Sequence, residues 1–291
     1  MLSNFYNFEY FMTKKPIIIA NWKMKLRWNE AVDLARGIFD RFGKLDLKDT
    51  AEIVLCPSYT AMSKVRKILG LGREMDLDSA DKAKKADIHR IQKSQKEYNN
   101  IKLGAQDVFW EENGAYTGEI SIEMLRDLEC KYFIIGHSER RQYLGETNEM
   151  VNKKLKRVLE AGGVPIICVG ETREERRQGK KDSTVVNQVI KAFNGIKLEG
   201  GQRAIIAYEP VWVIGTGQAM KPEDAEYMAN LIRQVALDFC NKDDLDIIYG
   251  GSVDSGNIGS FIERERINGF LVGSAALDVH EFLRMVKLIS S

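Results

Sequence analysis

Residues 204–217 read AIIAYEPVWVIGTG, and this stretch contains the features that decide the fold. It opens with a short apolar run, Ala204–Ala207, which is typical of a buried strand. A single carboxylate, Glu209, then stands directly before Pro210, and a residue in that position favours an extended conformation. An apolar segment follows, closed by two glycines. The stretch predicts a strand, a carboxylate at its end and a lid attached to that carboxylate. The alternative is a strand, a surface acid and an ordinary turn.

Eight apolar runs of this kind occur along the chain, and helix-like segments separate them. Each run is four to six residues long, is rich in Ile and Val, and lacks clean alternation with polar residues. Strands that are covered on both faces have this composition. The runs are Ile17–Ala20, Ile53–Cys56, Ile101–Ala105, Tyr132–Gly136, Val164–Val169, Ala204–Tyr208, Asp246–Tyr249 and Gly269–Val272.

The repeated strand–helix pattern predicts the fold class. Eight such units in 291 residues indicate an α/β protein with an eight-stranded parallel (β/α)8 barrel in a single domain, since such barrels have ~250 residues. A doubly wound open sheet is the alternative, because it also alternates strands and helices. No G-x-G-x-x-G motif follows the first run, which disfavours a dinucleotide-binding sheet.

Several predicted helices have recognisable starts, formed by capping residues or a first-turn proline. These are Ser58 before Tyr59–Leu69, Thr147 before Asn148–Ala161, Pro222 at the start of a helix with an apolar stripe, and Asp278 with Glu281, as a capping box, before Val279–Ile289.

The composition limits the function classes. Lys and Arg total 43 against 42 Asp and Glu, which disfavours a nucleic-acid or membrane-surface protein. The four cysteines are widely spaced without a CxxC pair, as in reduced cytoplasmic proteins. Three histidines far apart in sequence disfavour a metal centre. No apolar run approaches the roughly 20 residues that span a bilayer. We therefore expect a cytoplasmic protein without a metal.

Two segments fall outside the barrel pattern. Residues 1–13 are rich in aromatic side chains but lack the basic start of a signal peptide. We interpret them as an N-terminal extension, with the hypothesis that Met12 is an alternative start, so that residues 14–291 form the catalytic domain. Residues 71–99 contain no strand-like run and carry six basic residues between Lys82 and Lys96. We interpret them as a solvated or disordered insertion, with a basic contact surface as the alternative.

Polar and small residues follow five of the eight runs. In a parallel barrel the carboxyl ends of the strands converge on one pocket. Small loops after the seventh and eighth strands are the usual phosphate site, and a carboxylate, an imidazole and an ammonium group suit proton transfer beside a carbonyl. The residues are Asn21 and Lys23 after the first run, His137 and Glu139 after the fourth, Glu209 after the sixth, Ser252 after the seventh, and Gly273 and Ser274 after the eighth.

Five motifs in these positions together resemble the triosephosphate isomerase family. The resemblance covers about Pro16–Ile289 apart from the insertion, and it implies the TIM-barrel fold and an isomerase of the two triose phosphates that acts in glycolysis and gluconeogenesis. The motifs are Asn21-Trp22-Lys23-Met24, Gly114-Ala115-Tyr116-Thr117-Gly118-Glu119, Gly136-His137-Ser138-Glu139-Arg140-Arg141, Tyr208 to Gly217, and Tyr249-Gly250-Gly251-Ser252-Val253.

The resemblance implies a role for each strand-end residue. Glu209 is the base that takes a proton from the carbon beside the substrate carbonyl. Neutral His137 donates a hydrogen bond to the oxygens of the enediol(ate). Lys23 stabilises negative charge and binds substrate together with Asn21, and Glu139 supports Lys23. Contacts to the substrate phosphate are implied for Gly215, Ser252, Gly273 and Ser274.

The resemblance also implies an assembly and a moving lid. The loop that contains Thr117 resembles the one that enters a neighbouring subunit, which implies a homodimer. Pro210–Trp212 and Gln218–Met220 would be the two hinges of the lid. No cofactor or metal is implied, and no nucleic acid or membrane partner. Arg140, Glu146 and Cys168 we interpret as structural.

Two positions stay open at this point. Ser252 is equally suited to capping a helix and to contacting phosphate. Ser274 stands where the family often has a second glycine, so its backbone φ decides whether the residue is strained.

Two alternative functions differ in class. One is another phosphosugar barrel, such as an epimerase or an aldolase, which usually carries a metal set or a Schiff-base lysine. The other is a non-catalytic barrel that acts as a scaffold through its insertion. Intact Lys23, His137 and Glu209 disfavour the second alternative.

Overall fold

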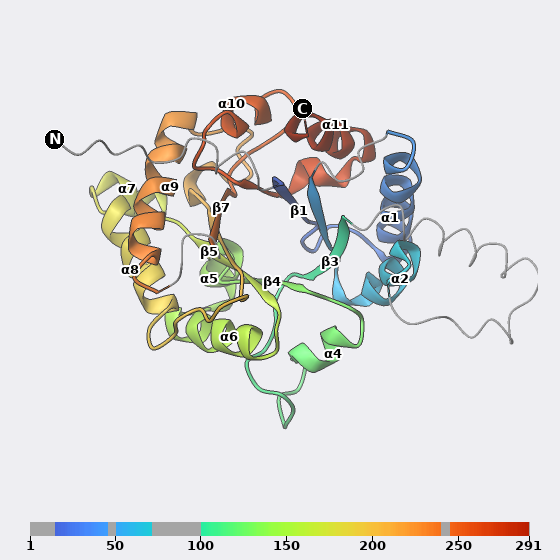
Figure 1. Ribbon diagram of the computed structural model, residues 1–291, viewed down its shortest axis with the longest axis horizontal. Helices are drawn as coiled ribbons and strands as arrows, with labels where there is room; N and C mark the ends of the chain where they lie inside the picture. The colour runs from blue at the N-terminus through green and yellow to red at the C-terminus, as the bar shows by residue number, and fades with distance from the viewer. Residues whose placement is uncertain (1–14, 46–50, 72–99, 240–244, 291) are drawn as a thin grey trace, which may run out of the picture.

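A computed structural model describes residues 15–45, 51–71, 100–239 and 245–290 of the chain. Its strands are all parallel, pair in chain order, and form a closed barrel because β8 pairs with β1. Figure 1 looks onto this barrel with the helices around it. The strands are β1 (Ile17–Asn21), β2 (Glu52–Cys56), β3 (Ile101–Ala105), β4 (Tyr132–Ile135), β5 (Val164–Val169), β6 (Ala204–Tyr208), β7 (Leu245–Tyr249) and β8 (Gly269–Val272).

The predicted (β/α)8 barrel is therefore confirmed, and the open-sheet alternative is wrong. Each of the eight predicted runs coincides with a strand, and the boundaries differ by at most one residue at an end. The differences are at residues such as Asn21 and Glu52, which pair in the ladder although they are polar. Strand pairing needs no hydrophobic side chain at the first or last position of a strand, so apolarity alone underestimates the length of these two strands.

Each strand separates two apolar layers, which explains the absence of polar alternation. In β1, Ile17 and Ile19 belong to a cluster made of strand residues, whereas Ile18 and Ala20 belong to a larger cluster that also contains helix residues. The first cluster fills the barrel interior and the second lies between barrel and helices. All four side chains are buried, because successive residues of a strand point to opposite faces.

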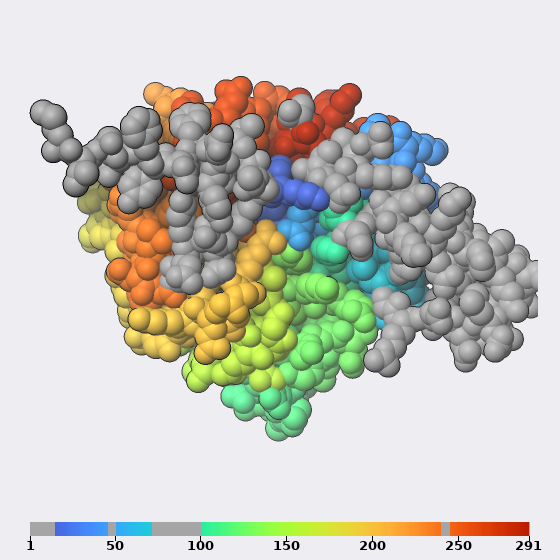
Figure 2. All heavy atoms as spheres, in the orientation of Figure 1, coloured from blue at the N-terminus to red at the C-terminus, as the bar shows by residue number. Residues whose placement is uncertain are grey.

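The helices lie outside the barrel and follow one another around it in chain order. The space-filling view in Figure 2 shows the same order as a continuous change of colour around the molecule. The α-helices are α1 (Trp28–Phe42), α2 (Tyr59–Leu69), α4 (Ile122–Arg126), α5 (Ser138–Leu144), α6 (Asn148–Glu160), α7 (Arg173–Arg177), α8 (Lys181–Ala192), α9 (Pro222–Ala236), α10 (Ile258–Ile262) and α11 (Val279–Ile289); η3 (Val211–Val213) and η5 (Ser274–Leu277) are short 3₁₀ helices.

The predicted helix starts are confirmed in position but only partly in mechanism. Thr147 caps α6 and Asp278 caps α11, each through its side chain, and Pro222 occupies the first turn of α9. Ser58 precedes α2, but its hydroxyl group makes no capping bond and lies 3.0 Å from the Thr60 hydroxyl. Ser58 therefore occupies the predicted N-cap position, but its side chain makes no capping bond.

The capping box predicted for α11 is wrong in its second half. Asp278 Oδ1 accepts from the backbone N–H of Glu281, as expected. The Glu281 carboxylate instead accepts from the backbone N–H and the hydroxyl group of Ser255, at 2.6 and 3.0 Å. Ser255, in the loop after β7, thus binds the Glu281 carboxylate in place of the Asp278 backbone N–H.

The two segments predicted to lie outside the barrel, residues 1–13 and 71–99, fall outside the described residues except for Leu71. Within the described ranges, no helix combines the length and the apolarity that a membrane span requires. Between β3 and α4 the chain projects outward beyond the ring of helices (Figure 1).

Candidate active site

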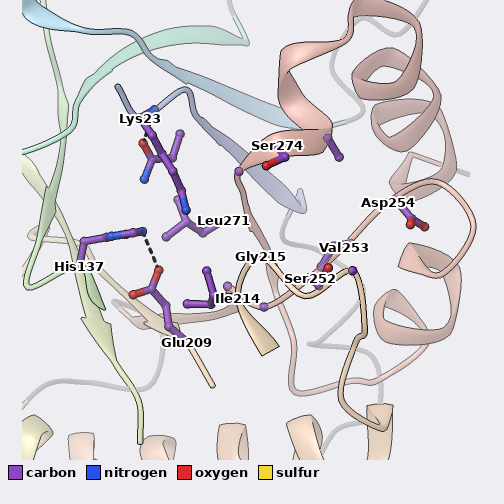
Figure 3. A pocket seen from close by; sticks show the side chains of 16 residues that line it. Lys23, His137, Glu209, Ile214, Gly215, Ser252, Val253, Asp254, Leu271 and Ser274 are labelled. Carbon is purple, nitrogen blue, oxygen red and sulfur yellow. Dashed lines mark hydrogen bonds and ion pairs between the residues drawn. The ribbon is translucent and has the colours of Figure 1, made fainter. Parts of the chain in front are cut away.

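One cavity of about 370 Å³ lies at the carboxyl ends of the strands. It brings together residues that are more than 250 positions apart in the sequence. Figure 3 shows His137 and Glu209 on one side of it, Lys23 above them and the serine-containing loops opposite. Its lining includes all eight residues predicted to catalyse or to bind substrate: Asn21, Lys23, His137, Glu209, Gly215, Ser252, Gly273 and Ser274.

Lys23 has an unusual backbone conformation, with a φ of 54°. A non-glycine residue in this left-handed region is uncommon and needs support from its surroundings. Asn21 Oδ1 accepts from the Lys23 backbone N–H at 3.0 Å, and Gln106 Nε2 donates to the Lys23 carbonyl at 2.9 Å. The same amide group of Gln106 donates to Cys56 O at 3.0 Å. Asn21 and Gln106 therefore hold the turn that aims Lys23 into the cavity.

The Lys23 ammonium group contacts Glu139 outside the cavity wall, with Nζ and Oε1 2.6 Å apart. This is the proximity that the sequence predicts for Glu139. Gly273 lies on the other side, since a Cβ atom placed there would be 3.3 Å from Lys23 Cε. The cation thus lies between Glu139 and the loop after β8.

His137 stands at the amino end of α5, where its Nδ1 accepts from the backbone N–H of Glu139 at 3.2 Å. Its Nε2 lies 3.0 Å from Glu209 Oε1. Because Nδ1 accepts a hydrogen bond, the proton of a neutral imidazole is on Nε2 and faces the cavity. Burial lowers the pKa of His137, but the adjacent Glu209 carboxylate outweighs it and the net shift is upward.

Glu209 is buried, and both of its carboxylate oxygens have partners. Oε1 faces His137, and Oε2 accepts from the backbone N–H of Ser138 at 2.9 Å. Burial raises the pKa of this carboxyl, whereas His137, the Ser138 N–H and Lys23 lower it, and the net shift is downward. The carboxylate is therefore ionised near neutral pH, as a base must be.

The predicted lid after Glu209 starts with η3 and contacts the buried carboxylate of Glu171, which the sequence analysis does not single out. Glu171 accepts from Trp212 Nε1 at 2.9 Å and from the hydroxyl group of Tyr208 at 3.0 Å. At the other end of the lid, the Met220 N–H donates to the hydroxyl group of Tyr249 at 3.3 Å. These contacts lie at the two predicted hinges.

Small residues form the wall opposite Glu209. Among the described non-glycine residues only Lys23 and Glu129 have a positive φ, so Ser274 is not strained. Ser274 also begins η5, and a short helix after the last strand is part of the usual phosphate site of such barrels. Ser252 is not a helix cap, because α10 starts at Ile258 with Asn257 in the capping position. The capping alternative for Ser252 is therefore wrong.

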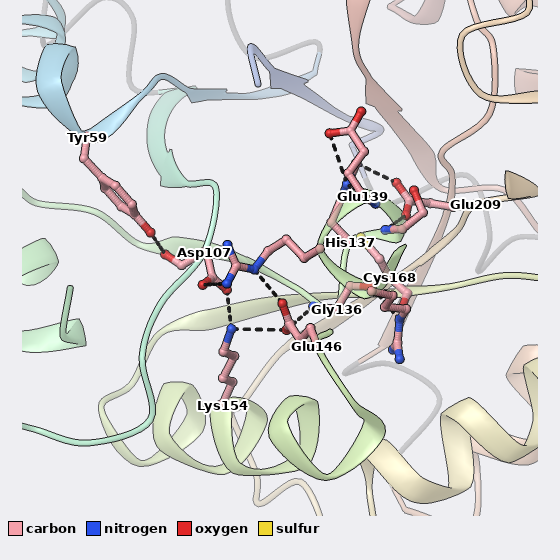
Figure 4. Close-up of polar contacts among 12 residues, drawn as sticks. Tyr59, Asp107, Gly136, His137, Glu139, Glu146, Lys154, Cys168 and Glu209 are labelled. Carbon is pink, nitrogen blue, oxygen red and sulfur yellow. Dashed lines mark hydrogen bonds and ion pairs between the residues drawn. The ribbon is translucent and has the colours of Figure 1, made fainter. Parts of the chain in front are cut away.

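A second polar cluster lies beside the cavity but does not line it (Figure 4). Asp107 contacts Lys154 and Arg140 at 2.6 and 2.9 Å. Glu146 contacts the same two cations at 3.2 and 2.5 Å. This arrangement fits the structural interpretation of Arg140 and Glu146.

Cys168 belongs to the interior of the barrel. Burial raises the pKa of its thiol well above the ordinary value. The group therefore stays protonated, which supports a packing role over a catalytic one.

Fold and cavity together define the class of this protein as a (β/α)8-barrel enzyme in which a buried carboxylate, an imidazole and an ammonium group share one pocket. A sequence model of the family described as triosephosphate isomerase matches residues 82–289. The chain is similar to proteins named triosephosphate isomerase from Dictyoglomus thermophilum, Alkaliphilus oremlandii and Endomicrobium trichonymphae, at 41%, 38% and 38% identity; each match covers 94% of this chain and 99%, 99% and 98% of the relative. The chain therefore belongs to the triosephosphate isomerase family and is an isomerase, which confirms the predicted family.

Proposed function

We propose that Glu209, His137 and Lys23 carry out the interconversion of dihydroxyacetone phosphate and D-glyceraldehyde 3-phosphate in glycolysis and gluconeogenesis. One observation carries this proposal: an ionised carboxylate, an imidazole Nε2 and an ammonium group face the same cavity as the small loops after β7 and β8. Proton transfer beside a carbonyl needs the first three groups, and a phosphate needs the loops.

In this mechanism Glu209 takes a proton from the carbon beside the carbonyl and returns it to the neighbouring carbon. The His137 Nε2–H donates a hydrogen bond to the substrate oxygens, and Lys23 stabilises the negative charge of the enediolate. The phosphate is held by Gly215, Ser252, Gly273 and Ser274. The Asn21 side chain supports Lys23 by accepting a hydrogen bond from the Lys23 backbone N–H. Glu139 supports the Lys23 side chain.

Glu209 must leave its present partners before it can act, because both of its oxygens are occupied. Closure of the lid over the phosphate would accompany this rotation and exclude water from the enediolate. Departure of Glu209 also removes the group that raises the pKa of His137. The imidazole then stays neutral and remains a hydrogen-bond donor to the substrate.

A coupled isomerase assay tests the proposal. We expect turnover of glyceraldehyde 3-phosphate without added metal, and a far lower kcat/KM for glyceraldehyde, which lacks the phosphate. Equal activity on the two substrates would refute the phosphate assignment. Turnover that is abolished by a chelator and restored by a divalent cation would instead favour the epimerase or aldolase class.

We infer that the chain forms a homodimer through the loop that contains Thr117. This loop is exposed and projects from the barrel (Figure 1). Large apolar side chains that follow β1 and β4 are also exposed: Met24 by 97%, Tyr143 by 71% and Leu144 by 65%. Exposed apolar side chains of this size are typical of an interface.

Sedimentation equilibrium tests the assembly. We expect a dimer for the full chain and a monomer for Thr117→Arg, because a buried charge in a partner's pocket is costly. A monomeric full chain would refute the inference. The cytoplasm is the location that fits this role, and fractionation of cells of the source organism with an antibody would test it.

The domain assignment is also a proposal: residues 14–291 form the barrel domain, with an extension at 1–13 and an insertion at 71–99. The isomerase assay on variants that lack either segment tests it. Full activity in both would support the assignment. Loss of activity on removing residues 71–99 would give the insertion a part in catalysis, whereas a full chain without activity would favour the scaffold alternative.

A further inference from the structure

The backbone of Glu209 is fixed by an unusually close neighbour. Glu209 N donates to Val169 O at 2.7 Å, and Val211 N donates to Glu171 O at 3.1 Å. Gly170 lies between these two bonds, and a Cβ atom placed on it would be 1.7 Å from Glu209 O. Any side chain at this position would push the backbone of the proposed base out of place. Glycine is therefore required here for steric reasons.

A glycine in this position brings a second problem, because its backbone is less restrained than that of any other residue. Rotation of a peptide plane beside Gly170 would move the surface against which Glu209 rests. One side chain binds both backbone polar groups of this residue. Gln188 Oε1 accepts from Gly170 N at 2.7 Å, and Gln188 Nε2 donates to Gly170 O at 3.1 Å.

Hydrogen bonding rather than packing holds Gln188 in this position. Its side chain comes from α8, in the outer ring of helices, and is only partly buried. It also lines a second cavity, of about 530 Å³, behind the first hinge of the lid, together with Val211 and Trp212. The side chain therefore has space into which it could move, and its two bonds to Gly170 are what orient it.

We propose that Gln188 is a positioning residue for Glu209. It fixes the peptide planes of Gly170, Gly170 fixes the backbone of Glu209, and only the side-chain torsions of the base remain free to carry the carboxylate from Ser138 to the substrate. Gln188 does not line the active-site cavity, so it acts through Gly170 and Glu209 and not by touching the substrate. This inference rests on the proposed role of Glu209.

The first test replaces Gln188 by Met, which has a similar length and makes neither bond. We expect kcat to fall about 10- to 100-fold while KM changes less than about threefold, since a misplacement of ~1 Å can cost 10²-fold. Gln202→Met is the matched control. Gln202 also accepts from one backbone N–H, that of Glu199, and donates to one carbonyl, Leu159 O, but it lies just before β6. We expect an unchanged kcat in the control, even if both variants lose similar stability.

A double variant distinguishes a failure of the proposed role of Glu209 as the base from a failure of the proposed positioning role of Gln188. In a Glu209→Gln background, Gln188→Met should cause no further loss, because the residue that it positions no longer acts as a base. If Glu209→Gln alone keeps near-normal turnover, the proposed function fails. If Glu209→Gln is inactive but Gln188→Met has normal kcat, or if its loss adds fully in the double variant, only the positioning role is overturned.

Gln188→Glu gives a readout that a purely structural role would not change. When protonated, the introduced carboxyl can donate to Gly170 O and accept from Gly170 N, whereas the ionised form can only accept. The ratio of its kcat to that of the unchanged chain should therefore rise as the pH is lowered from about 8 to about 5, through the range in which a carboxyl group gains its proton. The same ratio for Gln188→Met should be flat. A flat ratio for Gln188→Glu would overturn the proposal.

Discussion

Two clusters of charged side chains lie next to each other and meet at the segment after β4, and they have opposite properties (Figure 4). One consists of Lys23, His137, Glu139 and Glu209 and borders the cavity. The other consists of Asp107, Arg140, Glu146 and Lys154 and does not. A single stretch of four residues, His137 to Arg140, contributes to both.

The second cluster is saturated with opposite charges. Each of its two carboxylates contacts both cations, and each cation contacts both carboxylates. Glu146 also accepts from the backbone N–H of Gly136 at 2.9 Å. Burial raises the pKa of Glu146, but Lys154 and Arg140 outweigh it and the net shift is downward. Such a closed set leaves no group free for chemistry.

In the first cluster the buried carboxylate, that of Glu209, is only weakly paired. Glu209 contacts an imidazole and one N–H, and neither is a permanent cation. The difference between the two clusters shows that an ionised, buried carboxylate is not by itself enough to identify the catalytic base. What distinguishes Glu209 is that its partners can be exchanged for a substrate in the adjoining cavity.

The largest effect is expected from Glu209→Gln. The amide keeps the shape and can accept from Ser138, but its NH2 group then faces the Nε2–H of His137, so we expect the free energy of unfolding to fall by about 1–3 kcal/mol. It cannot take a proton, so kcat should fall about 10²- to 10⁴-fold with little change in KM. Steady-state kinetics and chemical denaturation measure the two quantities. Near-normal turnover would refute the assignment of the base.

Lys154→Met, in the saturated cluster, is expected to lower stability strongly and to change kcat little. It leaves two buried carboxylates with one cation, and breaking a buried pair costs about 3–5 kcal/mol of unfolding free energy. Because Lys154 lies outside the cavity, we expect kcat of the folded fraction to change only a few-fold. Denaturant titration and kinetics at low temperature check this. A loss of kcat as large as that of Glu209→Gln, with unchanged stability, would remove the distinction between the clusters.

The sequence predicts one of these clusters better than the other, for a physical reason. Residues such as His137 and Glu209 stand directly after apolar runs, so parallel pairing alone brings them to one rim. Lys154 lies in the middle of α6, where nothing local indicates that its side chain is buried. Its partner Asp107 is 47 residues away. Contacts of this kind depend on how the helix packs.

The same limit applies to the supports of the site. Gln106 holds the Lys23 turn from 83 residues away, and Glu171 binds Trp212 from 41 residues away. A prediction from the local sequence also fails where a tertiary partner competes. The Glu281 carboxylate accepts from Ser255 and not from the backbone at the start of its own helix. Strand order and strand ends follow from the pattern of residues, whereas these long-range partners require the fold.

The pKa of His137 gives a further test of the difference between the two clusters, because it depends on Glu209 and not on Lys154. In the folded protein Glu209 raises this pKa against the effect of burial. A histidine with a raised pKa stabilises the fold below its unfolded pKa of ~6.5, and this contribution is lost as the pH rises through the folded value. In Glu209→Gln the main cause of the rise is gone, while burial and Lys23 still lower this pKa more than Glu139 raises it. We therefore expect the pKa of His137 to fall below that of the unchanged chain, and below ~6.5.

An NMR titration measures this shift, and the chain has only three histidines to assign. Lys154→Met is the control, because it should leave the pKa of His137 unchanged. A pKa that is the same in Glu209→Gln as in the unchanged chain would mean that the carboxylate and the imidazole are not in contact in solution.

The smallest effect is expected at the edge of the saturated cluster. The Tyr59 hydroxyl donates to the backbone carbonyl of Asp107 at 2.6 Å, not to its carboxylate. Tyr59→Phe removes this one bond and leaves every charge paired, so unfolding free energy should fall by about 1 kcal/mol. Tyr227→Phe is the matched control, since its hydroxyl donates to Asp182 in a solvent-exposed hydrogen bond, and it should cost less than about 0.5 kcal/mol. Denaturant titration compares the two variants. A loss at Tyr59 as large as that of Lys154→Met would mean that the cluster depends on its backbone anchor as much as on its charges.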